Sequence, residues 1–129
     1  LGPNVAAEGV DVKEGTIGNI IRNNIFYGKG QLGVNGGDSW MDVKGSYTII
    51  ENNKGYDALV DGFQVHIKGD GFGENNVFIN NYCEVNSKGM GFYIQKKGES
   101  ANGNIVYENN VVKNAEKGVT NILITTSKK

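Results

Sequence analysis

Pairs of asparagine recur along the chain at nearly constant spacing, and this repeat constrains the fold more than any other feature. The pairs are Asn23-Asn24, Asn52-Asn53, Asn80-Asn81 and Asn109-Asn110. A short apolar stretch rich in β-branched residues precedes each pair, which is typical of a β-strand and too short for a helix. The chain is therefore expected to repeat one structural unit about four times, with a period of roughly 29 residues.

A second repeated segment lies between the asparagine pairs and alternates with a period of two. It covers residues 9–13, 40–44, 64–68 and 93–97. Alternate side chains of a strand point to opposite faces, so one set is expected to face a core. The predicted inner columns are Val10, Met41, Val65 and Ile94, followed by Val12, Val43 and Ile67. The predicted outer columns are Gly9, Trp40, Gln64 and Tyr93; Asp11, Asp42, His66 and Gln95; and Lys13, Lys44, Lys68 and Lys97.

The length of the repeat selects one architecture. Propeller blades need four strands in about 40–50 residues, and helical repeats need long stretches of helical periodicity. The shorter unit found here, with two or three short strands, fits one coil of a β-solenoid, whose coils must stack to bury their inner faces. The 20 glycines and 18 asparagines suit frequent sharp turns. We predict an all-β, right-handed parallel β-helix of about four coils, forming a single domain over residues 1–129. Stacked asparagines are expected to hydrogen-bond from coil to coil.

Composition excludes some classes of function. A formal net charge of -1 argues against a nucleic-acid-binding surface, which is normally strongly basic. No apolar run approaches the ~20 residues that a membrane-spanning helix needs. The first and last repeats lie close to the two ends of the sequence. Two interpretations stay open: the chain is the C-terminal part of a longer solenoid, or its coils stack end to end into oligomers or filaments.

The outer columns are the predicted location of any chemistry. Lysines stacked at the ~4.8 Å spacing of parallel strands repel one another unless carboxylates or an anionic ligand neutralise them. Trp40 and Tyr93 are expected beside these charges, where aromatic rings can stack on sugars. His66 is the only histidine and falls within the same columns. The alternative is a solvated charged face that only prevents aggregation.

Three segments carry a resemblance to a known family. Residues 8–15, 38–45 and 61–66 resemble secreted microbial right-handed β-helix repeat proteins of the pectate-lyase-like superfamily. The resemblance covers essentially the whole chain and is more specific for fold than for activity. It implies a secreted, extracellular protein. The relatives look longer on the N-terminal side, which favours the interpretation as a fragment.

The resemblance also implies roles for individual residues. Polysaccharide lyases of this superfamily use a Lys or Arg base to remove the C5 proton of a uronate, while calcium or another cation neutralises the carboxylate. On this basis Lys44 and Lys68 are candidate bases, and His66 is a second acid or base. Asp42 and Asp61 are candidate calcium ligands. The candidate substrate-binding residues are Trp40, Lys13, Tyr93, Lys97 and Gln64.

The sequence thus leaves two classes of function. The first is an extracellular β-helix protein that binds an acidic polysaccharide, with cleavage by β-elimination as a further hypothesis. The second is a non-catalytic structural solenoid that associates end to end. Fold alone does not decide between them.

Overall fold

The computed structural model describes residues 1–126, which form a solenoid of three parallel β-sheets. Sheet 1 contains β1 (Val10–Val12), β4 (Met41–Val43), β7 (Phe63–Val65) and β10 (Phe92–Ile94). Sheet 2 contains β2 (Ile20–Arg22), β5 (Ile49–Glu51), β8 (Val77–Ile79), β11 (Ile105–Tyr107) and β13 (Ile124–Thr125). Sheet 3 contains β3 (Ile25–Tyr27), β6 (Lys54–Tyr56), β9 (Tyr82–Ser87) and β12 (Val111–Ala115). One turn of 3-10 helix, η1 (Val34–Gly36), interrupts the second coil.

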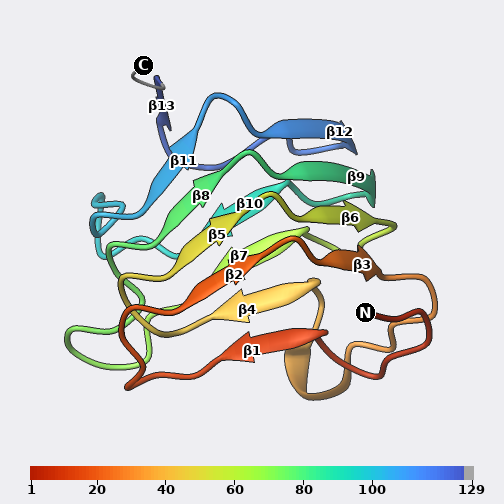
Figure 1. Cartoon of the computed structure of the whole chain (residues 1–129), viewed down its shortest axis with the longest axis horizontal. Helices are drawn as coiled ribbons and strands as arrows, with labels where there is room; N and C mark the ends of the chain where they lie inside the picture. The colour runs from red at the N-terminus through yellow and green to blue at the C-terminus, as the bar shows by residue number, and fades with distance from the viewer. Residues whose placement is uncertain (127–129) are drawn as a thin grey trace.

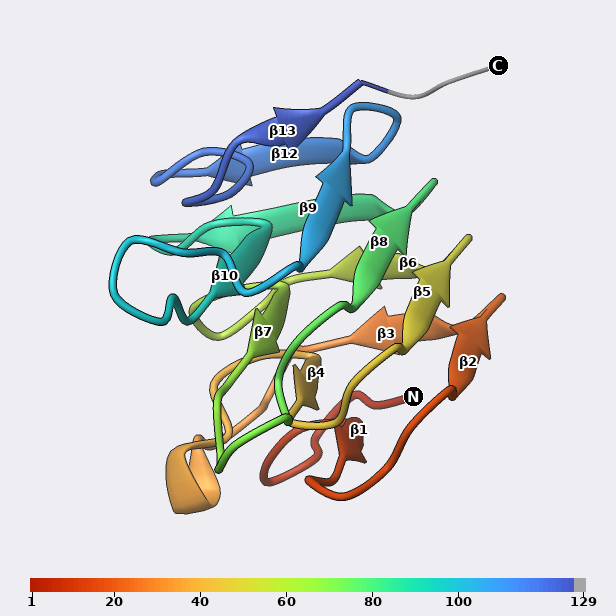
Figure 2. The same cartoon turned by 90° about the vertical axis from the view of Figure 1, so that its left-hand side faces the viewer.

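Each coil adds one strand to every sheet, and the coils rise from β1 to β13 (Figure 1). The path from β1 through β2 to β3 turns in the right-handed sense as it climbs, as the two views together show (Figure 2). The prediction of an all-β parallel solenoid is confirmed, with about four coils and a repeat of about 29 residues. The last three residues of the predicted domain lie outside the described residues. Among residues 1–126, no helix has the length and apolar character that crossing a bilayer requires.

Buried asparagines line the turn between sheets 2 and 3. The side-chain NH2 of Asn53 donates to Asn81 Oδ1 at 3.1 Å, and that of Asn81 donates to Asn110 Oδ1 at 3.0 Å. The backbone N–H of Asn53 also donates to Asn81 Oδ1. These bonds satisfy polar groups that would otherwise be buried without partners. The predicted asparagine ladder is therefore confirmed, and Asn76 with Asn104 adds a similar pair at another turn.

Aromatic rings fill the centre of the solenoid. Phe63 stacks on Phe92 with ring centroids 5.3 Å apart, and Phe78 contacts Phe92 from sheet 2 at 5.0 Å. Trp40 also belongs to this core, with 2% of its surface exposed and its ring 5.5 Å from that of Phe63. The prediction that Trp40 faces outward is wrong. A Cβ at Gly55 would overlap the Trp40 ring, so a glycine in β6, across the same coil, makes room for it.

The predicted alignment of the third and fourth coils with the first two differs from the observed one by two residues. Met41 pairs with Phe63, not with Val65, and Phe63 pairs with Phe92. A shift of two preserves which residues face in and which face out, so the alternating pattern cannot detect it. The shift arises because the segment from Met41 to Phe63 is much shorter than the segment from Val10 to Met41. The true outer columns are Asp11, Asp42, Gln64 and Tyr93, followed by Lys13, Lys44, His66 and Gln95.

Candidate active site

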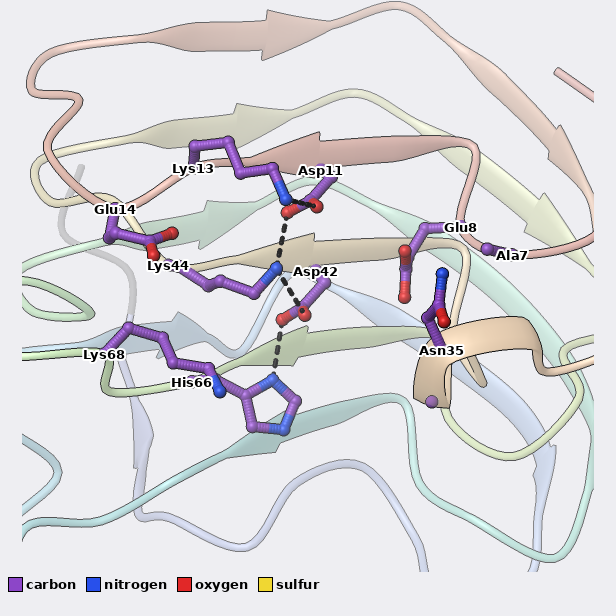
Figure 3. Close-up of a pocket in the computed structure, with 11 residues that line it drawn as sticks. Ala7, Glu8, Asp11, Lys13, Glu14, Asn35, Asp42, Lys44, His66 and Lys68 are labelled. Atoms are coloured by element: carbon purple, nitrogen blue, oxygen red, sulfur yellow. Dashed lines mark hydrogen bonds and ion pairs between the residues drawn. The ribbon is translucent and has the colours of Figure 1, made fainter.

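A chain of ion pairs crosses the outer face of sheet 1 over three coils (Figure 3). Lys13 Nζ lies 2.6 Å from Asp11 Oδ2, and Lys44 Nζ lies 2.8 Å from Asp11 Oδ1. The same Lys44 amine is 3.3 Å from Asp42 Oδ2, and Asp42 Oδ1 is 2.7 Å from Nδ1 of His66. We call these five residues the charged chain. The alternating charges of the two lysines and the two aspartates attract their neighbours along the row, and His66 joins it through its hydrogen bond with Asp42.

Parallel register places the members of the charged chain beside one another. Asp11 and Asp42 are paired positions at the centres of β1 and β4, and both point away from the core. Lys13, Lys44 and His66 each follow directly after the last residue of a strand in sheet 1. Because successive rungs stack about 4.8 Å apart, side chains of one column come within hydrogen-bonding reach of the next.

The charged chain forms one wall of an open hollow of about 490 Å³. Glu8, from the segment before β1, and Asn35, from η1, stand on the other side of it (Figure 3). Lys68 and Glu14 also line this hollow, and both are exposed. We call it the first hollow. It brings together four carboxylates, three lysines and the histidine on one surface.

A second hollow continues along the stack toward the fourth coil. Its lining includes Gln64, Asp61 and Tyr93, and it shares His66 and Gly36 with the first hollow. The Tyr93 ring lies 5.9 Å from the His66 ring at an angle of 49°. His66 therefore stands between two adjoining hollows, which together form a groove across sheet 1.

Charge and burial shift the pKa values of three groups in the groove. Partial desolvation lowers the pKa of Lys44, but the hydrogen bond to Asp11 and the charges of Asp42 and Asp11 outweigh it, so that the pKa rises. Desolvation raises the pKa of Asp11, but the hydrogen bonds that Asp11 accepts from Lys13 and Lys44 outweigh it. The pKa of Asp11 is therefore lowered. Burial raises the pKa of Glu8, and the nearby charges of Asp42 and Asp11 add to this. Lys44 is therefore a firmly protonated cation at neutral pH.

The pairing of His66 with Asp42 has a direct chemical consequence. A carboxylate can only accept hydrogen bonds, so Nδ1 of His66 donates to Asp42 Oδ1 in this pair. In the neutral ring, the proton on Nδ1 leaves Nε2, on the far side of the ring, with a free lone pair (Figure 3). Asp42 is 10% exposed and His66 is 31% exposed, so the carboxylate is shielded while the ring reaches solvent. This arrangement suits a general base held in one orientation.

Most of the residues expected at the site from the sequence lie in this groove. The first hollow contains Lys13, Asp42, Lys44, His66 and Lys68, and the second contains Asp61, Gln64, His66 and Tyr93. Trp40 does not belong with them because it is in the core. Lys97 lies in the loop after β10, where its backbone pairs with Ser100. Lys68 and Lys97 do not continue the lysine column, because His66 and Gln95 occupy those rungs.

The two carboxylates expected to bind calcium have other partners. Asp42 is bonded to Lys44 and His66. Asp61 accepts from Gln64 Nε2 at 2.8 Å and from the backbone N–H of Met90 at 2.7 Å. Calcium needs six to eight oxygen ligands, and an ammonium group beside a carboxylate opposes it. Within residues 1–126 no group of three or more His, Cys, Asp or Glu residues is arranged to hold a metal ion. The residues present therefore do not fit a calcium site.

Sequence reasoning assigned no role to Glu8 or Asn35, although both line the groove. Asn35 has φ 56° within η1, in the connection before β4. Glu8 lies outside the strand that follows it, so its orientation depends on the turn before β1. Neither residue belongs to an alternating column, and no periodic signal could have identified them.

Comparison with known proteins relates the chain to a lyase. No protein-family model matches the sequence, and no curated protein is significantly similar to it. The solved structures include an alginate lyase from Paenibacillus sp. str. FPU-7, which is 34% identical with a TM-score of 0.76. The match covers 96% of this chain and 42% of the lyase, so this chain spans less than half of that protein's length. The chain is a β-solenoid that matches a β-helix lyase in structure, as the resemblance in the sequence implied.

Proposed function

We propose that the groove across sheet 1 binds an acidic polysaccharide of the alginate type and cleaves it by β-elimination. The observation that carries the proposal is the His66–Asp42 pair, which stands beside a protonated lysine between two adjoining hollows. The structural match to an alginate lyase over 96% of this chain supports the choice of substrate. Secretion, which the resemblance in the sequence implies, is consistent with a polymeric substrate outside the cell.

The reaction has two chemical requirements. A base removes the proton from C5 of a uronate, the electron pair forms the C4–C5 double bond, and the C4–O4 bond breaks. The departing O4 takes a proton from water. A positive group must also stabilise the negative charge that develops on the sugar carboxylate. One general base typically accelerates such a proton transfer by about 10²–10⁴-fold.

His66 and Lys44 divide these roles. His66 Nε2 accepts the C5 proton, because Asp42 holds the ring in the tautomer that leaves this nitrogen free. Lys44 supplies positive charge, since its raised pKa keeps it protonated. This differs from the role of base that the sequence suggested for Lys44. Lys13 and Lys68 are exposed and provide cations at the edge of the groove.

The two hollows give the path of the bound chain. With the scissile bond over His66, the sugars on one side occupy the first hollow and those on the other side occupy the second. Tyr93 and Gln64 then contact the sugars in the second hollow. Gln64 is held in place by Asp38 and Asp61, to which its Nε2 donates at 2.8 Å in both cases.

The test is the ultraviolet absorbance of an unsaturated uronate product from alginate and other polyuronates. We expect His66→Ala to lower the rate about 10²–10⁴-fold, with the protein still folded because the ring is partly exposed. Lys97→Ala, which removes a lysine outside the groove, is the matched control and should leave the rate unchanged. Absence of product across the panel, from protein shown to be folded, would contradict cleavage.

The rival hypothesis of an end-to-end structural solenoid stays a prediction. It expects assemblies that grow with protein concentration in light scattering. A monodisperse monomer over the accessible concentration range would rule it out.

A further inference from the structure

We propose that Glu8 is a specificity-determining residue of the groove: as a carboxylic acid it hydrogen-bonds the carboxylate of a bound acidic sugar, and as a carboxylate it repels that sugar. The inference rests on the proposed function, because it assumes that the groove binds an acidic polysaccharide. Glu8 had no predicted role from the sequence, and it is not a member of the charged chain.

The position of Glu8 places its carboxyl group inside the first hollow. Figure 3 shows the group between Asn35 and Asp42, facing the same space as the charged chain. Its Oε2 lies against the loop that follows η1, where a Cβ built on Gly37 would be 2.8 Å away. The loop thus confines the side chain to the groove, and a sugar in the first hollow must pass close to it.

Glu8 differs from the other partly buried carboxylates of the first hollow in its lack of an ion-pair partner among residues 1–126. Asp11 is paired with Lys13 and Lys44, and Asp42 is paired with Lys44 and His66. Within the part of the chain that the structure describes, Glu8 forms no ion pair. A polymer of carboxylates entering the groove therefore meets a negative charge that no ion pair neutralises whenever Glu8 is ionised.

The surroundings of Glu8 favour its neutral form. Burial raises its pKa first of all and outweighs a hydrogen bond with the backbone of Glu8 itself, which lowers it. The charges of Asp42 and Asp11 raise the pKa further, against the smaller effect of Lys44. Below this pKa the O–H of the acid can donate to a sugar carboxylate, whereas above it the group can only accept. The titratable groups that share the hollow are Asp11, Lys13 and Glu14 from β1 and the turn after it, Asp42 and Lys44 from β4, and His66 and Lys68 after β7.

The experiment uses a background in which His66 is replaced by alanine. This removes the proposed base, so that the ligand is not consumed. The dissociation constant of an alginate oligosaccharide is measured by calorimetry at about pH 4.5 and about pH 7.5, because a carboxyl whose pKa is raised carries less negative charge at the lower pH. Three proteins are compared: His66→Ala alone, and the same protein with Glu8→Gln or with Glu14→Gln.

We expect the His66→Ala protein to bind roughly five- to tenfold more tightly at the lower pH, the effect of one like charge in a partly desolvated site. Glu8→Gln should bind tightly at both pH values, because the amide is neutral and still donates. Glu14→Gln removes the same formal charge from an exposed position of the same hollow and should keep the pH dependence.

Each contrary result has a separate meaning. A Glu8→Gln protein that keeps the pH dependence, or that binds more weakly at both pH values, overturns this inference alone. Failure of all three proteins, and of the wild-type chain, to bind at either pH overturns the proposed function and this inference with it.

Discussion

The turn between sheets 2 and 3 and the outer face of sheet 1 belong to the same coils, yet they repeat with different regularity. At the turn, successive asparagines of the ladder are always 28 or 29 residues apart, and each is at least partly buried. The paired positions of sheet 1 are Val10, Met41, Phe63 and Phe92, and the step from Met41 to Phe63 is much shorter than the other two. The difference shows which part of a coil maintains the stack and which part can vary.

The physical reason lies in the environment of the polar groups. A buried amide must find its partners in the protein, so each asparagine of the ladder needs the same residue at the same height in the next coil. Side chains on the outer face of sheet 1 have water as an alternative partner. The connections before β4 and β7 can therefore differ in length, and the longer one carries η1, which forms a wall of the groove.

The largest expected effect tests the position of Trp40. Trp40→Ala should lower the free energy of unfolding by about 3–5 kcal/mol, because it removes a ring that fills the core beside Gly55. The folded fraction should bind polysaccharide as the wild type does. Tyr93→Ala, on the outer face, is the matched control and should weaken binding with little loss of stability. Urea unfolding and calorimetric binding separate the two outcomes, and a stable Trp40→Ala protein that fails to bind would contradict this assignment.

A somewhat smaller effect tests the asparagine ladder. Asn81→Ala should lower the free energy of unfolding by about 3 kcal/mol, because it leaves donors of Asn53 and the carbonyl of Ile50 buried without partners. Asn24 stands at the end of the same ladder and has a ladder partner on one side only. Asn24→Ala should therefore lower the free energy of unfolding by about 1 kcal/mol. If urea unfolding showed equal losses of unfolding free energy for the two variants, the position of an asparagine in the ladder would not affect its contribution to stability.

The smallest effect tests the charged chain. Because the pKa of Asp11 is lowered below its ordinary value of 3.8, its ion pairs stabilise the folded state above that value. This contribution is lost as the pH falls through the lowered pKa. Asp11→Asn should therefore cost about 1 kcal/mol or less at neutral pH, since solvent screens the partly exposed pairs. As the pH falls below 3.8 the difference from wild type should shrink, and unfolding curves at neutral and at acid pH measure it. If the difference in unfolding free energy between Asp11→Asn and wild type were the same at both pH values, the charge of Asp11 would not be the source of the stabilisation.

The sequence by itself determined the architecture of this protein. The spacing of the asparagine pairs predicted the coil, and the alternation in residues 9–13 and 40–44 predicted which side chains of β1 and β4 face the core. It also predicted that Asp42, Lys44 and His66 share one outer surface. These features follow from local periodicity and from the need to bury identical polar groups in register, both of which can be read along one chain.

Only the tertiary structure decided the details of the groove. A period of two is unchanged by a shift of two positions, so the sequence could not show that His66, not Lys68, follows Lys13 and Lys44 in one column. Trp40 turns inward because Gly55, in sheet 3 of the same coil, leaves space for its ring. Glu8 reaches the groove through the path of the segment before β1. In each case the position depends on contacts between residues far apart in the sequence, for which a single chain's local pattern carries no signal.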